Sequence, residues 1–301
     1  MTGVACLMPH ALDRKRLRVI WEEALAEDGA NNDLTSLIAI SPTQAAEAFV
    51  IAREPGVFAG NAIFDVVKEA YPSELAVAPR VEDGSDLQPG TIIAEVSGSA
   101  RQLLAIERTL LNFLQRLCGI ATTTRAYVRA AEGTRARIYD TRKTVPGWRQ
   151  LDKYAVRCGG GKNHRMGLSD AVLVKDNHLA RIEPHRLSAV VLDMVQAATR
   201  LSPPPAFVEF EVDTLAQFDQ IVSVPGVDVI LLDNFSLTDM RQAVARRDEL
   251  GLLGKLQIEA SGGVGIDEVA DIAATGVERI SVGRLTHSVR ALDIALDIET
   301  A

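Results

Sequence analysis

Residues 207–234 read FVEFEVDTLAQFDQIVSVPGVDVILLDN, and two short apolar runs, Phe207–Val212 and Val229–Leu232, stand at the two ends of this stretch. Apolar runs of this length, rich in β-branched and aromatic residues, predict β-strands. Similar runs recur at 136–139, 171–174, 256–259 and 279–282, with helical patterns between several of them. The alternation predicts an α/β fold with parallel strands and right-handed crossovers, and the number of repeats indicates a barrel.

Polar residues follow each predicted strand at its carboxyl end. A β/α barrel has its active site at that edge, so residues spread over about 140 positions would meet in space. A single polar strand end is commonly a helix cap or a turn, but several with complementary charges favour a site. In chain order they are Asp140-Thr141-Arg142-Lys143, Lys175-Asp176-Asn177, Glu211-Val212-Asp213, Asp233-Asn234, Ser261-Gly262-Gly263 and Gly283-Arg284.

The stretch from Tyr139 to His178 is unusually rich in cations. It holds eight Lys and Arg against four Asp, a net charge of about +4, whereas the whole chain carries −8. It also contains His164 and the run Gly159-Gly160-Gly161, where a backbone can approach a ligand closely. A cationic region in an acidic protein is typical of a site for small polyanions, so we expect anionic metabolites to bind here.

Composition excludes several other classes of protein. A pI near 5.3 and 5% aromatic residues argue against nucleic-acid binding, which favours basic domains with interleaved aromatics. No apolar run reaches the roughly 18 residues of a membrane span, and the N-terminal stretch lacks the apolar core of a secretory signal. The three cysteines Cys6, Cys118 and Cys158 are odd in number and lack C-x-x-C spacing. These features predict a cytoplasmic protein without a zinc cluster or a disulfide framework.

The first third of the chain has mixed α and β patterns. Apolar residues repeat at helical spacing over Arg14–Ala26 and form a wide face over Arg101–Ala131, while Ala46–Ala52 reads as a strand. Asp-Gly and Pro-Gly turns within Val81–Val96 indicate a compact β unit. Arg108 falls off the apolar face of the long helix, and its plain interpretation is a solvated surface charge.

The glycine motifs favour phosphate binding over nucleotide binding. Ser261-Gly262-Gly263 and Gly283 follow late strands, where barrels that bind phosphate have their phosphate loops. The run Gly159-Gly160-Gly161 matches neither G-x-G-x-x-G nor a P-loop, so no nucleotide cofactor is expected. We expect this run to be a tight loop that brings His164 and Arg165 inward.

Two further groups of residues leave alternatives open. Glu211 and Asp233 end neighbouring strands, where they could bind magnesium, ribose hydroxyls or a proton, or simply pair with nearby Lys and Arg. Cys158 adjoins the glycine run, so a nucleophilic thiol is conceivable. No motif pairs this thiol with a base, which favours a small packing residue instead.

Several long runs resemble the quinolinate phosphoribosyltransferase family, and the likeness extends from about residue 17 to 298. The runs that carry it are ERTLLNFLQR at 107–116, DTRKTVPG at 140–147, KYAVRCGGGKNHRMGLSDAVLVKD at 153–176, EFEV at 209–212, LDN at 232–234, ASGG at 260–263 and SVGRLTHS at 281–288. The resemblance implies an open, sandwich-like N-terminal α/β domain over 1–120, joined by the C-terminal segment 288–301. It also implies an incomplete α/β barrel over 121–287.

The resemblance implies a reaction and roles for named residues. The reaction joins quinolinate to phosphoribosyl pyrophosphate, with magnesium, and yields nicotinate mononucleotide, carbon dioxide and pyrophosphate. Arg142, His164, Arg165 and Lys175 would hold the two carboxylates of quinolinate, beside Thr141, and Arg108 would reach the site of a partner subunit in a homodimer or a higher oligomer. The groups implied for phosphoribosyl pyrophosphate and magnesium are Lys143, Glu211, Asp233, Ser261, Gly262, Gly263, Ser281, Val282, Gly283 and His287.

Two competing functions stay open at this point. A phosphoribosyltransferase of the same fold could use another pyridine carboxylate, although a monocarboxylate would need fewer cations than Arg142, Arg165 and Lys175 supply. A non-catalytic barrel that binds a phosphometabolite would keep Ser261-Gly262-Gly263. It would have no need of Glu211 and Asp233 opposite a cation cluster.

Overall fold

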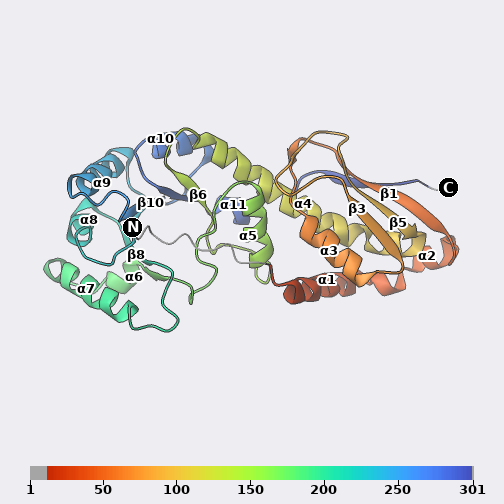
Figure 1. Ribbon diagram of the computed structural model, residues 1–301, viewed down its shortest axis with the longest axis horizontal. Helices are drawn as coiled ribbons and strands as arrows, with labels where there is room; N and C mark the ends of the chain where they lie inside the picture. Colours follow the sequence, from red (N-terminus) through yellow and green to blue (C-terminus); the bar gives the residue numbers. More distant parts are fainter. Residues whose placement is uncertain (1–11, 300–301) are drawn as a thin grey trace. The chain divides into compact units, whose positions relative to one another are not determined.

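A computed structural model describes residues 12–299, and its contacts divide the chain into two compact units (Figure 1). The first, here called the sandwich unit, consists of residues 12–125, 144–160 and 285–299. The second, called the barrel unit, consists of Ala126–Lys143 and Gly161–Arg284. Cys6 and the N-terminal stretch considered for a signal lie outside the described residues.

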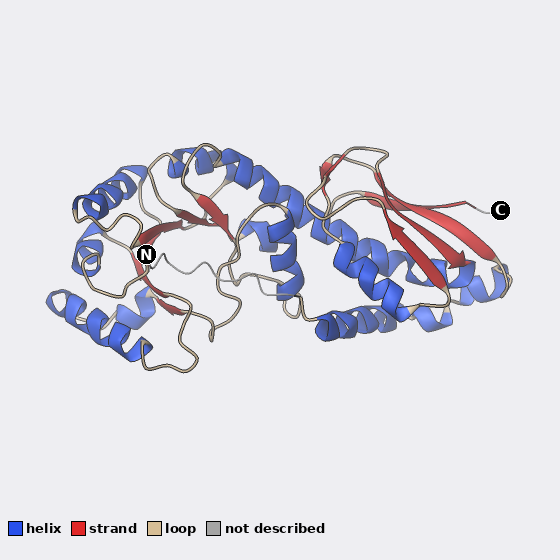
Figure 2. Cartoon of the chain, viewed as in Figure 1, coloured by secondary structure: helices blue, strands red, loops and turns tan. Residues whose placement is uncertain are grey.

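The sandwich unit is built on a four-stranded antiparallel sheet, in the order β12-β1-β5-β3, with helices α1, α3 and α4 on one side of it (Figure 2). Alternate residues of β1, from Ala46 to Ala52, are buried, as expected for a sheet with one covered face. The elements are α1 Arg14–Asp28, α2 Leu34–Ala39, β1 Ala45–Ala52, β2 Gly56–Val57, α3 Asn61–Ala70, β3 Leu75–Pro79, β4 Asp86–Leu87, β5 Ile92–Ser99, α4 Ala100–Ala130, α5 Arg149–Cys158 and β12 Ile294–Glu299.

Local sequence explains where the first helix begins and ends. The Asp13 side chain accepts hydrogen bonds from the backbone N–H groups of Lys15 and Arg16, and Gly29 ends α1 in the left-handed conformation. The predicted helices over 14–26 and 101–131 are confirmed as α1 and α4. Of the turns within Val81–Val96, Asp83-Gly84 precedes β4 and Pro89-Gly90 joins β4 to β5. These two strands pair with different partners, β4 with β2 and β5 with β1 and β3.

Helix α5 belongs to the sandwich unit because its contacts lie there. The Asp152 carboxylate is fully buried and accepts two hydrogen bonds at 3.0 Å from the Arg116 guanidinium of α4. Trp148, just before α5, stacks on Phe113 with ring centroids 4.6 Å apart. A buried carboxylate is costly unless it is paired, so this ion pair fixes where α5 lies on α4.

The C-terminal segment returns to the sandwich unit along α4. The backbone N–H of Leu292 donates to the Gln115 carbonyl at 2.9 Å, and the Gln115 side-chain amide donates to the Ile294 carbonyl at 2.8 Å. Strand β12 then pairs with β1 in antiparallel register. The segment approaches α4 so closely at Gly119 that a Cβ atom there would lie 2.2 Å from the Arg290 carbonyl oxygen.

The barrel unit contains six parallel strands in the order β6-β11-β10-β9-β8-β7, and its helices lie outside the strands (Figure 2). β6 and β7 are the two edges of this sheet, which makes the barrel incomplete. All six predicted strands are confirmed to within two residues, and the fold class is confirmed. The elements are β6 Arg137–Tyr139, β7 Val172–Val174, α6 Asp176–Leu179, α7 Leu187–Ala198, β8 Val208–Val212, α8 Leu215–Ile221, β9 Val229–Asp233, α9 Leu237–Glu249, β10 Gln257–Ser261, α10 Val269–Ala273, β11 Arg279–Ser281 and α11 Arg284–His287, whose last residues belong to the sandwich unit.

Within residues 12–299, none of the helices is both long enough and apolar enough to cross a membrane.

The close approach at Gly119 generates a stability prediction. Gly119→Ala should lower the free energy of unfolding by about 1–3 kcal/mol, because the new methyl group meets a backbone carbonyl and the C-terminal segment must shift. This change would outweigh the gain of roughly 1 kcal/mol that alanine brings to a helix interior. Chemical denaturation measures it, with Thr123→Ala on the same helix as the control. An unfolding free energy equal to or above that of the wild type would show that the segment does not pack as described.

Candidate active site

The carboxyl ends of the parallel strands bring the predicted site residues of the barrel unit to one edge. Asp233 at the end of β9 pairs in register with Ser261 at the end of β10. Ser281 of β11 pairs in register with Tyr139 of β6, so Thr141–Lys143 and Val282-Gly283 leave neighbouring strands. Glu211 of β8 lies on the strand next to that of Asp233, as predicted. The edge therefore collects residues far apart in the sequence.

Asp140 explains how the glycine-rich loop brings His164 and Arg165 inward. A parallel bridge joins Lys162 to Tyr139 at the end of β6. The fully buried Asp140 carboxylate then accepts hydrogen bonds from the Asn163 amide at 2.6 Å and the His164 backbone N–H at 2.8 Å. The loop is thus fixed beside β6, and both His164 and Arg165 are buried, at 6% exposure each.

Two arginines of the site lie close enough to influence each other. Burial, and after it the positive charge of Arg142, lower the pKa of Arg165. The Arg165 guanidinium also donates to the Ala171 carbonyl at 3.2 Å, which fixes its direction at the start of β7. Two like charges near one another are unfavourable unless an anion lies between or beside them. The negative charges of Glu209 and Asp170 offset part of this repulsion, and a carboxylate or phosphate ligand beside the two guanidinium groups would offset it further.

Lys175 forms an ion pair with Glu211. The Lys175 ammonium contacts the Glu211 carboxylate, and the Lys175 side chain is 45% exposed whereas that of Glu211 is 8% exposed. This is the ion pair considered as the alternative interpretation of Glu211. Because Lys175 reaches solvent, its ammonium could also meet an incoming anion without leaving its place.

Further carboxylates lie at the same edge. Asp233 accepts a hydrogen bond from the Asn234 amide at 2.8 Å. Burial, together with the negative charges of Asp176 and Asp233, raises the pKa of Asp213. Glu211 and Asp233 offer carboxylate oxygens, the kind of ligand that magnesium prefers.

The loop Ser261-Gly262-Gly263 needs its glycines. Gly262 and Gly263 have φ values of 107° and 63°, which side chains rarely adopt. A Cβ atom at Gly262 would lie 2.2 Å from the Asn234 side-chain oxygen and 2.8 Å from the Asn234 backbone nitrogen. Asn234 itself has a φ of 54° and donates its N–H to the Ser261 carbonyl at 3.0 Å. Asn234 thus links the Asp233 carboxylate to the glycine loop.

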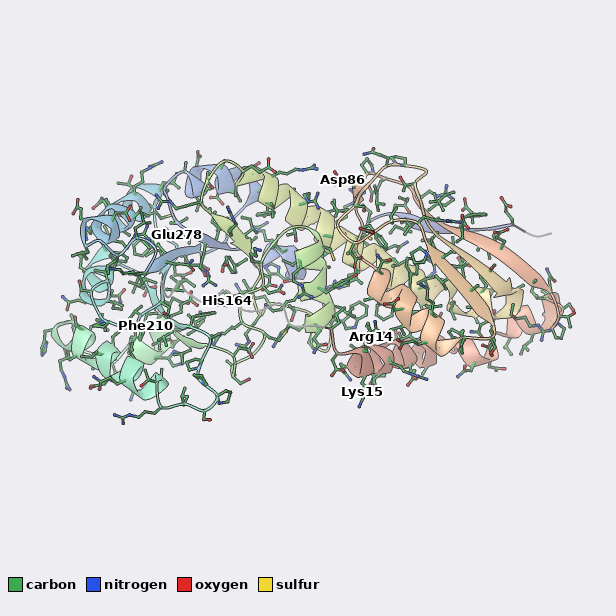
Figure 3. The ribbon with its side chains drawn as sticks, in the orientation of Figure 1. Arg14, Lys15, Asp86, His164, Phe210 and Glu278 are labelled. Atoms are coloured by element: carbon green, nitrogen blue, oxygen red, sulfur yellow. The ribbon has the colours of Figure 1, made fainter. Side chains whose placement is uncertain are left out.

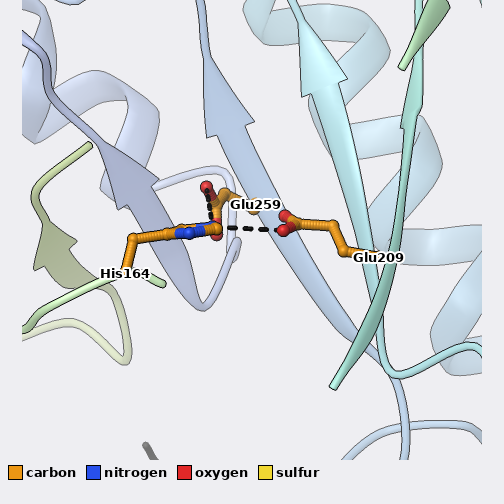
Figure 4. A group of neighbouring side chains, drawn as sticks. All are labelled: His164, Glu209 and Glu259. Atoms are coloured by element: carbon orange, nitrogen blue, oxygen red, sulfur yellow. Dashed lines mark ion pairs between the residues drawn. The ribbon is translucent and has the colours of Figure 1, made fainter. Parts of the chain in front are cut away.

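His164 lies among the strands of the barrel unit (Figure 3) and faces a buried group of charged side chains (Figure 4). Its Nε2 is 3.1 Å from the Glu209 carboxylate of β8 and 3.5 Å from that of Glu259 on β10. Arg279 of β11 pairs with Glu259 at 2.7 Å, and all four side chains are at least 93% buried. Ser281 also donates its hydroxyl to Glu259.

The two nitrogens of the His164 ring have different partners. Burial alone would lower the pKa of His164, but Glu259 and Glu209 outweigh it and raise the pKa to about 9. The Nδ1 atom accepts the Arg165 backbone N–H at 2.8 Å, an arrangement that needs a lone pair on Nδ1. The carboxylates therefore favour a charged ring and the Arg165 N–H favours a neutral one. In both states Nε2 carries the proton, 3.1 Å from the Glu209 carboxylate.

Glu209, Glu259 and Arg279 were not among the predicted site residues. A sequence signal for them exists, because a charged residue within an otherwise apolar parallel strand, as in VEFEV or QIEAS, must be buried and paired. What the sequence does not show is which residue pairs with which.

The remaining predicted residues are placed as follows. The Lys143 backbone N–H donates to the Thr141 hydroxyl at 3.1 Å, and the Lys143 side chain is exposed. Arg108 and His287 belong to the sandwich unit. The Arg108 side chain is 60% exposed, 3.9 Å from Glu107, and His287 is exposed with its Nδ1 2.7 Å from the Ser288 hydroxyl.

The cysteines of the described residues are poor nucleophiles. Cys118 and Cys158 are unpaired, and burial raises the pKa of each thiol to about 12. Since the thiolate is the reactive form, Cys158 is a packing residue in this environment.

Comparison with known proteins identifies the family. The model of the quinolinate phosphoribosyl transferase N-terminal domain matches residues 33–118, and that of the C-terminal domain matches residues 120–297. The chain belongs to the quinolinate phosphoribosyltransferase family. The resemblance seen in the sequence is therefore confirmed, and the chain is a member of a family of pentosyltransferase enzymes.

Members of the quinolinate phosphoribosyltransferase family resemble the chain over nearly its whole length. A nicotinate-nucleotide pyrophosphorylase [carboxylating] of Mycobacterium leprae is 43% identical over 268 residues, 88% of this chain and 91% of that protein. A probable nicotinate-nucleotide pyrophosphorylase [carboxylating] of Bacillus subtilis is 38% identical and covers 95% of both chains. The solved nicotinate-nucleotide pyrophosphorylase of Francisella tularensis is 33% identical with a TM-score of 0.86, over 98% of this chain and 100% of that chain.

Proposed function

We propose that this chain transfers the phosphoribosyl group of phosphoribosyl pyrophosphate to quinolinate, with loss of carbon dioxide, and so makes nicotinate mononucleotide for NAD biosynthesis. Membership in the quinolinate phosphoribosyltransferase family supports this reaction. Within the site, the observation that carries the proposal is geometric: the carboxyl ends of the parallel strands bring Arg142 and Lys175 to the edge where Asp140 holds the loop that carries Arg165.

Quinolinate matches this arrangement because it has two adjacent carboxylates. Their mutual repulsion and their desolvation require several fixed cations, and arginine suits them best because it binds a carboxylate through two parallel hydrogen bonds. Arg142 and Arg165 lie near each other, and Lys175 leaves the end of β7 with its ammonium accessible. We assign these three residues to the two carboxylates.

The ribose and pyrophosphate parts of phosphoribosyl pyrophosphate fit the part of the edge that holds Glu211, Asp233 and Lys143. When the bond from ribose C1 to pyrophosphate breaks, positive charge develops on the ribose and negative charge on the leaving group. Glu211 and Asp233 would face the ribose hydroxyls and the developing positive charge, and Lys143 would meet the pyrophosphate. Bound at Glu211 and Asp233, magnesium would neutralise charge on the pyrophosphate.

The 5-phosphate of phosphoribosyl pyrophosphate fits the glycine loop. Gly262 and Gly263 carry no side chains of their own, the space beside Gly263 is open, and Gly283 follows the neighbouring strand β11. Backbone N–H groups of such turns bind phosphate well. We place His287, with Ser281 and Val282, near this phosphate by the family resemblance.

Loss of the 2-carboxylate needs little from the protein. After the pyridine nitrogen carries the ribose, the electron pair left by departing carbon dioxide is stabilised by the adjacent positive nitrogen. The chain then holds and desolvates the carboxylate, a task that the buried Arg165 can perform, and a proton from solvent takes the place of carbon dioxide at C2. A nucleophilic side chain is not required, which agrees with the raised pKa of Cys158.

A turnover assay tests the proposal. The full chain with quinolinate, phosphoribosyl pyrophosphate and magnesium should release pyrophosphate and carbon dioxide in equal amounts, and nicotinate in place of quinolinate should give little pyrophosphate. Equal or faster turnover of nicotinate would favour the alternative of a different pyridine carboxylate, and no turnover of either would favour a binding protein.

The cytoplasmic location that the composition predicts is part of the same proposal.

Arg165→Ala tests the carboxylate site. The change should weaken quinolinate binding by about 2–5 kcal/mol, because a substrate carboxylate would stay buried without its partner. Calorimetry on the folded variant measures the affinity, with Arg246→Ala, a surface arginine of α9 that pairs with Asp219, as the control. Quinolinate affinity within twofold of the wild type in Arg165→Ala would remove Arg165 from the site.

We further propose a homodimer in which Arg108 completes the site of the partner subunit. The family resemblance supports this role, and Arg108 is exposed on α4, so it is available to a second chain. In a symmetric dimer each of two sites would then be built from both chains.

Subunit mixing tests the shared site. An inactive Arg108→Ala chain mixed with an inactive Lys175→Ala chain should recover activity, because one site of each hybrid dimer lacks both defects. Random exchange makes about half of the dimers hybrid, so about a quarter of wild-type activity is the ceiling. No recovery after subunit exchange, verified with differently tagged chains, would place Arg108 in its own chain's site or outside the site altogether.

A further inference from the structure

The barrel interior contains a layer of charged side chains one step below the site. Side chains two residues apart on a strand face the same side, so Glu209 lies directly beneath Glu211 on β8. In the same way Glu259 lies beneath Ser261 on β10, and Arg279 lies beneath Ser281 on β11. Glu259 and Arg279 are paired in register. Barrel interiors are normally filled by layers of apolar side chains, so a charged layer at this depth needs an explanation.

His164 joins this layer to the site. Its ring is held edge-on by Phe207 at 5.4 Å and by Tyr139 at 6.5 Å between ring centroids. Its Nε2 points down at Glu209 and Glu259, and its Nδ1 accepts the N–H of Arg165. In this arrangement both ring nitrogens of His164 are used by protein groups, and the residue that it holds in place is Arg165.

We infer that Glu209, supported by Glu259, is a positioning residue that fixes the His164 ring and through it the backbone of Arg165, so that the Arg165 guanidinium meets a substrate carboxylate at a set place. The inference rests on the proposed function for the identity of that carboxylate. It changes the role of His164 from a direct carboxylate ligand, as the resemblance implies, to a support for Arg165.

The charges of the group favour this role over a metal site. The ligand atoms of His164, Glu209 and Glu259 lie within 4.8 Å of one another, a spacing that a metal ion also accepts. Arg279, however, already pairs with Glu259 at 2.7 Å and stacks on Tyr139, with its guanidinium carbon 4.2 Å from the ring centroid. A divalent cation at this place would be repelled by the buried Arg279 guanidinium and would compete with it for the Glu259 carboxylate.

Substitutions at Glu209 test the inference. Glu209→Ala should raise the Kd for quinolinate about tenfold or more, because Arg165 loses its fixed place, and should change the KM for phosphoribosyl pyrophosphate by less than about twofold. Glu209→Gln keeps an acceptor for the Nε2 proton and nearly the same volume, so it should restore quinolinate affinity to within about threefold of the wild type. Quinolinate affinity within twofold of the wild type in Glu209→Ala would overturn the inference.

The matched control is Glu278→Gln. Glu278 neighbours Arg279 in sequence, but its carboxylate pairs with the buried Arg247 of α9 at 2.9 Å and accepts the Ile258 N–H, away from His164. Loss of this carboxylate should leave the Kd for quinolinate unchanged even if the unfolding temperature falls. A tenfold loss of quinolinate affinity in the control would mean that any weakened barrel gives the result, and would overturn the inference.

A double-mutant cycle separates positioning from general damage. His164→Phe removes both ring nitrogens and keeps a planar ring, so its loss of quinolinate affinity should match that of Glu209→Ala. The double variant should lose no more than either single variant, because both changes break the same chain of contacts. Losses that add would show that Glu209 does not act through His164.

A measurement on the ring itself remains valid even if the chain has no activity. Nitrogen NMR of the His164 ring, assigned with His164→Phe, should show Nε2 protonated in the wild type and in Glu209→Gln. A ring in which the proton exchanges between both nitrogens, as in free imidazole, would overturn the inference whether or not Glu209→Ala folds. If the ring is fixed but the wild type neither binds nor converts quinolinate, the proposed function fails and the contact between Glu209 and His164 stands.

Discussion

Charge balance inside the barrel unit is the constraint on which the site depends. Cations that are to bind an anionic substrate must be held together before the substrate arrives, although they repel each other and lose hydration on burial. The unit meets this requirement with carboxylates that lie in the same interior. Glu259 compensates Arg279, Glu209 faces His164 and Glu211 faces Lys175. Arg142 and Arg165 lie near enough to repel each other, and an anion bound beside them would reduce that repulsion.

The parallel topology brings the balanced charges and the binding residues to the same end of the barrel unit. Because every strand of the sheet runs the same way, side chains two residues apart on β8, β10 and β11 form stacked layers. The lower layer, Glu209, Glu259 and Arg279, is buried and its charges are paired. The upper layer, Glu211, Ser261 and Ser281, lies at the edge where substrates would bind. Asn234 connects the two halves of that edge, since its amide holds Asp233 and its backbone closes on the glycine loop. The same fold can therefore serve a carboxylate at one side and a phosphate at the other.

Much of this arrangement could be predicted from the sequence. Short apolar runs marked all six strands, and the polar residues after them marked the edge, because strand period and strand ends are local properties. The lower layer could not be predicted, since the pairing of Glu209 with His164 or of Glu259 with Arg279 depends on strand order and register. The same reason applies to α5, which lies between two barrel strands in sequence but belongs to the sandwich unit through Arg116 and Asp152. The roles assigned to the individual site residues stay predictions, and among them are those of Arg108 and His287, which belong to the other unit.

The central claim is that the cations at the edge act as a set that recognises two carboxylates at once. The most direct measurement compares the binding of quinolinate with that of the two monocarboxylates nicotinate and picolinate, by calorimetry on the wild-type chain. Quinolinate should bind at least about 100-fold more tightly than either, because each monocarboxylate leaves part of the cation set without its partner. Affinities within about threefold of one another would contradict the account, since the arginines would then bind a single carboxylate and leave the second unrecognised.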